Sequence, residues 1–150
     1  MKILIQRVKY SKCTVDSKEI SKIGQGMLVF VGITNDDTAE DIEWLVNKMV
    51  NLRIFNDEDG VMNKSCLEIN GEIMIISQFT LHARTKKGNR PSYIDAAKPE
   101  ISEPLYNKFI ETTNQITGKP SATGIFGADM KIELLNDGPV TIIIKKKNRI

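Results

Sequence analysis

The sequence predicts one α/β domain of about eight strands and two helices. The chain has 150 residues, a length that suits a single domain. Its residues are 41% hydrophobic and 27% charged, a balance typical of a folded, soluble protein. Short apolar runs of strand type alternate with two longer segments whose apolar residues recur at helical spacing. We find no internal repeat, low-complexity segment or linker, so residues 1–150 are expected to form one domain.

The first part of the chain predicts three strands. Residues 2–8 alternate loosely between apolar and polar side chains, and residues 13–20 form a second short run of strand type. Residues 23–26 contain two glycines and predict a turn. The continuous apolar run at residues 27–33 is typical of a strand that is buried on both faces.

A helix is predicted to follow Thr38. Asp41 lies three residues later, which gives a capping-box pattern at the start of the helix. Apolar residues then recur at i, i+3, i+4, i+7 and i+8, namely Ile42, Leu45, Val46, Met49 and Val50. This spacing places them on one face of the helix.

The middle of the chain predicts a hairpin followed by a long strand. Residues 53–55 and 65–69 resemble short strands, with a hairpin turn in the acidic run at residues 56–60. This run lacks the spacing and the final glutamate of an EF-hand calcium loop, so no metal site is expected there. Asn70-Gly71 is a strong signal for a tight turn. Residues 72–81 then predict a long strand.

A second helix is predicted to begin with Ser102 as its cap and Pro104 early in its first turn. Gly118 and Pro120 are expected to end it. Its apolar stripe comprises Leu105, Phe109, Thr112 or Thr113, and Ile116.

Two closing strands are predicted at residues 131–135 and 140–144, joined by a turn at residues 136–139. This turn contains Gly138-Pro139. A peptide bond before proline can be cis at low cost, and a fixed cis-proline usually has a purpose. Glycine at this point also lets another backbone or a ligand approach closely.

The scarcity of histidine and cysteine excludes several kinds of site. His82 is the single histidine of the sequence, so any site that needs two histidines is excluded. Cys13 and Cys66 are 53 residues apart, without a CxxC motif, and are expected to be two small thiols of the core or surface. We expect no metal and no cofactor. So few cysteines, no signal peptide and no apolar run of about 18 residues predict a cytoplasmic protein.

The net charge of +2 conceals uneven blocks. Residues 36–72 carry three basic and ten acidic side chains, whereas residues 81–98 carry five basic and one acidic. The basic block follows the uncharged residues 73–80 directly. It is either a polyanion-binding rim beside a buried strand or a solvated loop, and the sequence leaves both open. The second basic cluster, at residues 145–149, resembles tails that are more often solubilising than functional.

The end of the uncharged strand carries the first candidate catalytic residues. Strand parity places Ser77, Phe79 and Leu81 on one face, and Gln78, Thr80 and His82 on the other. Ser77 or Thr80 could then act as a nucleophile with His82 as base. However, the sequence places no acidic residue to orient the imidazole, which argues against a triad.

Nine short motifs, spread over essentially the whole chain, resemble those of the D-aminoacyl-tRNA deacylases of the bacterial and eukaryotic type, the D-Tyr-tRNA deacylase family. They are Gln6-Arg7-Val8, Asp36-Asp37-Thr38, Asn51-Leu52-Arg53-Ile54-Phe55, Ser77-Gln78-Phe79-Thr80-Leu81, Lys87-Gly88-Asn89-Arg90-Pro91-Ser92, Asp95-Ala96-Ala97, Glu103-Pro104-Leu105-Tyr106, Phe126-Gly127-Ala128-Asp129-Met130 and Asn136-Asp137-Gly138-Pro139-Val140-Thr141. Each motif alone is modest evidence, but their order and spacing are highly specific.

The resemblance implies an enzyme that hydrolyses the ester between a D-amino acid and the 3′ end of tRNA. It implies a compact domain with a mainly antiparallel, barrel-like sheet and two main helices. It also implies a homodimer whose active sites lie at the interface. The catalytic segment then comprises Ser77, Gln78, Phe79 and Thr80. We expect no membrane partner and no DNA partner.

The resemblance also implies how the enzyme selects its substrate. Gly138-Pro139, in cis, is expected to reach into the pocket of the other subunit, with Arg7 bracing it. Its carbonyl groups would expel the side chain of an L-amino acid. A D-amino acid, and glycine mischarged on the alanine tRNA, would be accepted. Phe126 and Met130 are expected near the terminal adenosine.

The expected chemistry relies on the backbone rather than on a strong base. N–H groups around Phe79 and Thr80 can stabilise the oxyanion of an activated ester, and the 2′-hydroxyl of the tRNA is thought to help activate water. The residues expected to bind tRNA are Arg84, Lys86, Lys87 and Arg90. One departure is His82, where the family usually has an aromatic residue such as tyrosine.

Two other functions stay open at this point. One is the related deacylase that clears L-alanine from tRNA, in which the corresponding Gly-Pro bond is trans. The other is a non-catalytic dimeric RNA-binding module that uses the basic loop at residues 81–98.

Overall fold

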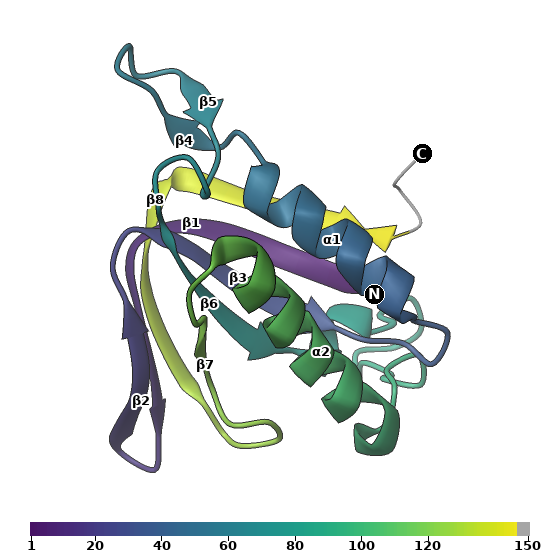
Figure 1. Ribbon diagram of the computed structural model, residues 1–150. Coiled ribbons are helices and arrows are strands. Elements are labelled where there is room, and N and C mark those ends of the chain that lie inside the picture. Colours follow the sequence, from purple (N-terminus) through teal and green to yellow (C-terminus); the bar gives the residue numbers. More distant parts are fainter. Residues whose placement is uncertain (147–150) are drawn as a thin grey trace.

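The computed structural model describes residues 1–146. They form a β-sheet built around one long strand, together with two α-helices (Figure 1). The elements are β1 Lys2–Val15, β2 Lys18–Ile23, β3 Gly26–Gly32, α1 Ala39–Asn51, β4 Phe55–Asn56, β5 Met62–Lys64, β6 Glu72–Ser77, the 3₁₀-helix η1 Phe79–His82, α2 Pro99–Thr117, β7 Ala122–Thr123 and β8 Lys131–Lys145. The predicted α/β class with two main helices is confirmed. None of the helices in residues 1–146 is both long and apolar enough to cross a membrane.

The main sheet is organised around β1. This strand pairs antiparallel with β8 along most of its length, with β3 through residues 2–8, and with β2 through residues 11–15. β6 then pairs parallel with β3, and β7 pairs parallel with β6. The sheet curves strongly and is nearly closed (Figure 1). The expected barrel-like and mainly antiparallel sheet is therefore confirmed.

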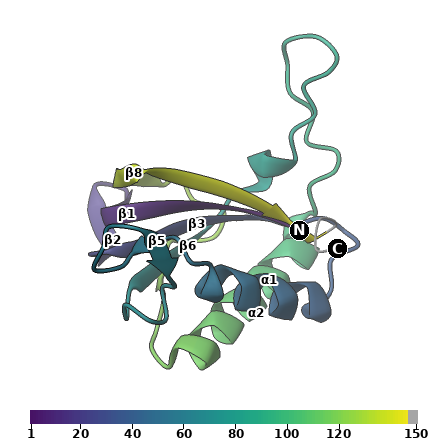
Figure 2. The same cartoon turned by 90° about the horizontal axis from the view of Figure 1, so that it is seen from above.

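Side chains of the sheet alternate between two hydrophobic cores. Both helices cover one face of the sheet (Figure 2), and the larger core lies between them and that face. The larger core includes Met27, Val29, Val31, Ile73 and Ile75, and the smaller core on the other face includes Leu28, Met74 and Ile76. Strands buried on both faces are continuous apolar runs, which explains the sequence of β3 and β6.

Helix α1 begins as the sequence predicts. The Thr38 hydroxyl accepts a hydrogen bond from the N–H of Asp41 at 3.3 Å, and the Asp41 carboxylate accepts one from the N–H of Thr38 at 2.9 Å. These two bonds form the capping box. The predicted apolar face, from Ile42 to Val50, is buried.

The prediction of a separate strand at residues 13–20 is wrong. Residues 13–15 continue β1, and the chain reverses at Asp16 and Ser17, which have φ angles of 49° and 64°. Positive φ at both central residues is typical of a tight two-residue hairpin. The sequence gives little sign of it, because Asp16 is followed by serine and not by the glycine that usually completes such a turn.

The strand predicted at residues 65–69 is also wrong, because this segment is a turn. The hydroxyl of Ser65 accepts a hydrogen bond from the N–H of Glu68, and the Glu68 carboxylate accepts one from the N–H of Ser65. This reciprocal pair has the Ser-x-x-Glu spacing of a capping box, which the apolar content of the segment conceals. The tight turn at Asn70, with φ of 52°, is confirmed.

Helix α2 begins three residues before the predicted cap. Its N-cap is Lys98, with Pro99 in the first turn, and Ser102 is buried inside the helix. Proline is favoured at the first helical position because it has no N–H to satisfy there. The predicted end is confirmed, since Gly118 is the C-cap with a left-handed φ of 74°.

Candidate active site

The segment at residues 77–80 leaves the sheet in a tight turn. Ser77 is the last residue of β6 and pairs with Val31 of β3. The N–H of Gln78 donates to the carbonyl of Val31 at 2.8 Å, and the next residues form η1. The prediction of a strand through Leu81 is therefore wrong. Residues 78–82 do not alternate between two faces of a strand as predicted. The physical reason is that β3 ends at Gly32, so the chain has no strand partner beyond Gln78.

This turn presents backbone donors. The N–H groups of Phe79 and Thr80 lie at the start of η1, where a helix supplies no partner for them. Within residues 1–146, no hydrogen bond from either N–H is found. Phe79 is 55% exposed, so the turn lies at the surface. The side chains brace one another, with Gln78 Nε2 donating to Thr80 Oγ1 at 2.5 Å. The turn can therefore offer two N–H groups to an oxyanion.

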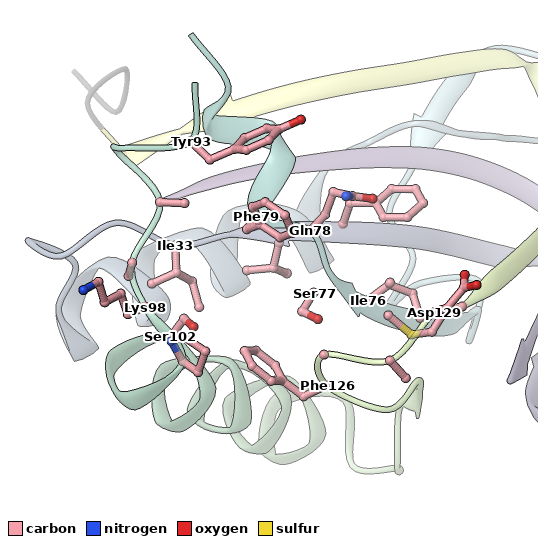
Figure 3. A pocket seen from close by; sticks show the side chains of 18 of the residues that line it. Ile33, Ile76, Ser77, Gln78, Phe79, Tyr93, Lys98, Ser102, Phe126 and Asp129 are labelled. Atoms are coloured by element: carbon pink, nitrogen blue, oxygen red, sulfur yellow. The ribbon is translucent and has the colours of Figure 1, made fainter. Parts of the chain in front are cut away.

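A cavity of about 570 Å³ opens beside the turn (Figure 3). Its lining includes five of the predicted site residues: Ser77, Gln78, Phe79, Phe126 and Met130. It also includes residues that were not among the predicted site residues, such as Tyr93, Lys98, Ser102 and Asp129. These come from the loop before α2, from α2 and from the loop after β7, so their common location depends on the tertiary fold.

Phe126 and Met130 are positioned by neighbours in the two cores. The rings of Phe126 and Tyr106 lie 5.8 Å apart, and the Tyr106 hydroxyl donates to the carbonyl of Ile75 at 2.6 Å. Burial raises the pKa of Tyr106, so its hydroxyl stays protonated and able to donate. A Cβ atom on Gly124 would lie 2.3 Å from the sulfur of Met130. Glycine at position 124 therefore leaves room for this methionine beside the cavity.

The predicted turn at residues 136–139 is wrong, because these residues bulge out of a continuous strand, β8. The register against β1 shifts between Gln6 and Val8, and residues 137–140 fall in this interruption. The Gly138–Pro139 peptide bond is cis, and both residues are exposed. We call residues 136–139 the Gly-Pro bulge. The sequence suggested a turn because asparagine, aspartate, glycine and proline are common to both structures.

Arg7 lies beneath the Gly-Pro bulge and is only 6% exposed. Its Nε donates to the carbonyl of Asp137 at 3.1 Å, and its Nη1 donates to the carbonyl of Ile54 at 2.7 Å. The Asp137 carboxylate lies 3.4 Å from the same Nε. Gly138 has φ of 123°, and a Cβ atom there would lie 2.9 Å from Arg7 Nη2. The guanidinium thus packs closely against the bulge.

Within one chain, the Gly-Pro bulge and the 77–80 turn lie at opposite ends of the sheet. Asn136 pairs with Val8, whose partner on β3 is Gly26, and Gly26 pairs with Glu72 at the start of β6. The 77–80 turn follows the other end of β6. Five residues of β-strand span about 17 Å. The structure therefore does not bring Gly138, Pro139 and Arg7 to the cavity of their own chain.

His82 lies away from this cavity. It lines a second cavity with residues near the N-terminus, including Met1, Lys2 and Asp36. Burial lowers the pKa of His82, so the imidazole is neutral at physiological pH, and its Nε2 is buried without a hydrogen-bond partner within residues 1–146. An arrangement with Ser77 or Thr80 as nucleophile and His82 as base gains no support from this placement.

The predicted tRNA-binding residues lie on a loop that projects from the body of the molecule (Figure 2). We call residues 84–92 the basic arm. Lys86, Lys87 and Arg90 are exposed along it. Arg84 is at its base and donates to both carboxylate oxygens of Asp95, at 2.5 and 2.7 Å. Arg84 thus forms part of the structure of the arm.

The C-terminal basic cluster is described only in part. Lys145 ends β8, and the ammonium of Lys146 lies 2.7 Å from the Asp37 carboxylate and 3.1 Å from the Asp41 carboxylate. Residues 147–149 of the cluster lie outside the described residues. Lys146 therefore anchors the end of β8 to the start of α1.

Comparison with known proteins identifies the family. A family model described as D-Tyr-tRNA(Tyr) deacylase matches residues 4–145. The chain belongs to the D-Tyr-tRNA deacylase family. Two deacylase-family relatives, each named D-aminoacyl-tRNA deacylase, come from Parabacteroides distasonis and Bacteroides thetaiotaomicron. They are 61% and 62% identical to this chain over 149 residues, which is 99% of each chain.

Two solved structures share the fold of this chain. A protein named c-Myc DNA Unwinding Element Binding Protein superposes with a TM-score of 0.91 at 40% identity and covers 97% of this chain and 98% of its own. A probable eukaryotic D-amino acid tRNA deacylase has a TM-score of 0.84 at 17% identity, with 95% and 97% of the two chains covered. At that identity the second likeness shows the fold alone.

Proposed function

We propose that the protein hydrolyses the ester bond of D-aminoacyl-tRNA and releases a free D-amino acid and tRNA. The relatives that share about 60% of its residues over nearly the whole chain are named for this activity. The observation that carries the proposal is the cavity of about 570 Å³, which is lined by Ser77, Gln78 and Phe79 at the start of η1. A cavity of this size is typical of a small-ligand site.

The proposed mechanism is attack of water on the ester carbonyl with backbone stabilisation of the oxyanion. The N–H groups of Phe79 and Thr80 hold the developing negative charge. The neighbouring 2′-hydroxyl of the tRNA assists in activating the water. Collapse of the tetrahedral intermediate breaks the bond to the 3′-oxygen of the tRNA, which takes up the proton. In other acyl-transfer enzymes, removing one such donor costs about 3 kcal/mol.

The cavity suits the terminal adenosine of the tRNA. Phe126 offers an aromatic ring at its wall, and Met130 offers an adaptable apolar side chain. Stacking of a base on an aromatic ring contributes about 1–3 kcal/mol. We therefore assign the adenosine to the side of the cavity formed by these two residues, with the ester directed toward the 77–80 turn.

Selection against L-amino acids is proposed to come from a second copy of the chain. The Gly-Pro bulge is exposed and lies far from the cavity of its own chain, yet Arg7 holds it from below. In a homodimer it would enter the partner's cavity and direct its carbonyl groups at the substrate's α-carbon. An L side chain would meet these groups, whereas a D side chain would point away. Glycine has no side chain, so glycine mischarged on the alanine tRNA is also proposed as a substrate.

The dimer interface is proposed to include the outward face of β8. Leu135 and Ile143 lie on either side of the Gly-Pro bulge and are 51% and 56% exposed. Association of two copies through this strand would cover both side chains and bring the bulge to the partner.

The tRNA backbone is proposed to contact the basic arm through Lys86, Lys87 and Arg90. Their charges are exposed on a projecting loop, as binding to phosphate groups requires. Arg84 stays a predicted contact, but its pairing with Asp95 makes it a weaker candidate than the other three. A cytoplasmic location, with no DNA partner, remains a prediction.

The proposed function is tested by incubating the purified protein with D-Tyr-tRNA, L-Tyr-tRNA and L-Ala-tRNA and measuring the release of each amino acid. We expect rapid hydrolysis of D-Tyr-tRNA alone. Selective hydrolysis of L-Ala-tRNA would instead indicate the related alanyl deacylase. Salt-dependent binding of tRNA without any hydrolysis would indicate an RNA-binding module.

A further inference from the structure

Phe79 is held from outside the sheet by a second aromatic residue. The 77–80 turn has left the strand pairing, and η1 has only four residues, so contacts of its side chains can contribute to its orientation. The ring of Phe79 is 55% exposed and receives little support from the cores. Its aromatic partner is Tyr93, whose ring lies 5.0 Å away at 78° in an edge-to-face arrangement (Figure 3).

Hydrogen bonds of the residues before and after Tyr93 in the chain hold it in place. Before it, the N–H and carbonyl of Ser92 pair with those of Arg84 at 3.0 and 2.8 Å. After it, the Asp95 carboxylate binds the Arg84 guanidinium through two hydrogen bonds. Ala97 then donates to the carbonyl of Ile33, directly after β3. These contacts close the base of the basic arm and attach it to the end of the sheet.

We infer that Tyr93 is a positioning residue for catalysis. It holds the ring of Phe79 and thereby directs the backbone N–H groups of Phe79 and Thr80 toward the substrate carbonyl. The inference rests on the proposed function, because it concerns the rate of ester hydrolysis. Tyr93 also lines the cavity, but its edge contact with Phe79 gives it a role that does not depend on binding tRNA.

The role is tested with a double-mutant cycle of Tyr93→Ala and Phe79→Ala, both of which keep the backbone N–H groups. Loss of an aromatic pair predicts that each variant lowers kcat for D-Tyr-tRNA by about threefold to tenfold. The double variant should be no worse than either single variant, because both remove the same contact. KM and tRNA affinity should stay at the wild-type values. Tyr93→Phe keeps the ring and should restore the wild-type kcat.

Ile94→Ala is the matched control, since Ile94 is the next residue and is 73% exposed. It should leave kcat unchanged, and thermal unfolding should show that all variants fold. If the wild type hydrolyses D-Tyr-tRNA and Tyr93→Ala has the same kcat, the positioning role is overturned while the proposed function stands. Additive losses in the double variant, or a loss confined to KM, also overturn it. If the wild type hydrolyses no aminoacyl-tRNA, the proposed function fails instead.

Discussion

At the scale of single residues, the proposed chemistry relies on backbone groups that residue types alone do not reveal. In the sequence, Ser77 and Thr80 are possible nucleophiles and His82 is a possible base. The structure places His82 on a different cavity and gives the Thr80 hydroxyl a hydrogen bond from Gln78. We therefore propose the Phe79 and Thr80 N–H groups as the oxyanion donors. Strand parity could not show this, because the strand ends where its partner ends.

Thr80→Ala should retain substantial activity. The substitution removes the hydroxyl and its bond to Gln78 but keeps the backbone N–H. We expect kcat for D-Tyr-tRNA to fall by no more than about tenfold. Removal of an oxyanion donor would lower kcat by roughly a hundredfold or more. Single-turnover hydrolysis measures this directly. Complete loss of activity, with fold and tRNA binding intact, would contradict the backbone-led mechanism.

His82→Phe should retain activity and reduce the acid sensitivity of the fold. Burial, the largest cause, lowers the pKa of His82 below its usual 6.5. Below about pH 6.5 the unfolded state then binds more protons than the folded state, so the stability contributed by neutral His82 is lost as pH falls through the folded pKa.

The measurement is thermal unfolding of both proteins between about pH 8 and pH 5, a range that spans the usual histidine pKa. Carboxylates also titrate in acid, so the difference between the two slopes is the informative quantity. The melting temperature of the wild type should fall more steeply below about pH 6.5 than that of His82→Phe. If the melting temperatures of both proteins change equally with pH, His82 has the same pKa in the folded and the unfolded state.

At the scale of elements, prediction succeeded where local and tertiary preferences agreed. Helix α1 was predicted with its cap, because a capping box and an apolar stripe coincide in sequence. For the 77–80 turn and the Gly-Pro bulge, the sequence predicts a longer strand and a turn, and both predictions are wrong. Their structures depend on where β3 ends and on how β8 pairs with β1. The local sequence determines neither of these features.

Gly138→Ala should impair D-Tyr-tRNA hydrolysis or relax its chirality. Gly138 has a left-handed φ of 123°, and an added Cβ would approach Arg7 Nη2 to 2.9 Å. The bulge would have to shift relative to its arginine support. We expect the ratio of D-Tyr-tRNA to L-Tyr-tRNA hydrolysis to fall by at least about tenfold, the equivalent of roughly 1.4 kcal/mol.

Gly60→Ala is a control for backbone strain. Gly60 also has a left-handed φ, of 76°, but an added Cβ there meets nothing within 4 Å. Both substitutions should lower the melting temperature modestly, because both force a side chain into a left-handed conformation. Only Gly138→Ala should change the D-to-L ratio. An unchanged ratio in Gly138→Ala would argue against a chiral role for the bulge.

At the scale of the whole molecule, the proposed active site requires two copies of the chain. The resemblance in the sequence implies a homodimer, and the homodimer remains a proposal. The register of β8, β1, β3 and β6 keeps the Gly-Pro bulge and the 77–80 turn at opposite ends of the sheet. One chain supplies the cavity and the N–H donors, and its partner would supply the group that excludes L-amino acids.

Complementation between two variants tests the proposal that each active site combines the backbone of one copy with the Gly-Pro bulge of another. Phe79→Pro removes one N–H donor at a position where a helix tolerates proline, and Phe79→Ala controls for loss of the ring. Gly138→Val disables the bulge. Each variant alone should lack fast, D-selective hydrolysis.

The measurement is the rate of D-Tyr-tRNA and L-Tyr-tRNA hydrolysis after the two variants are unfolded together and refolded. A mixed dimer contains one site with an intact turn from the Gly138→Val copy and an intact bulge from the Phe79→Pro copy. We predict that fast, D-selective hydrolysis returns, at up to about a quarter of the wild-type rate, since half of randomly formed dimers are mixed and each has one working site of two. No recovery in a preparation shown to contain mixed dimers would contradict the claim.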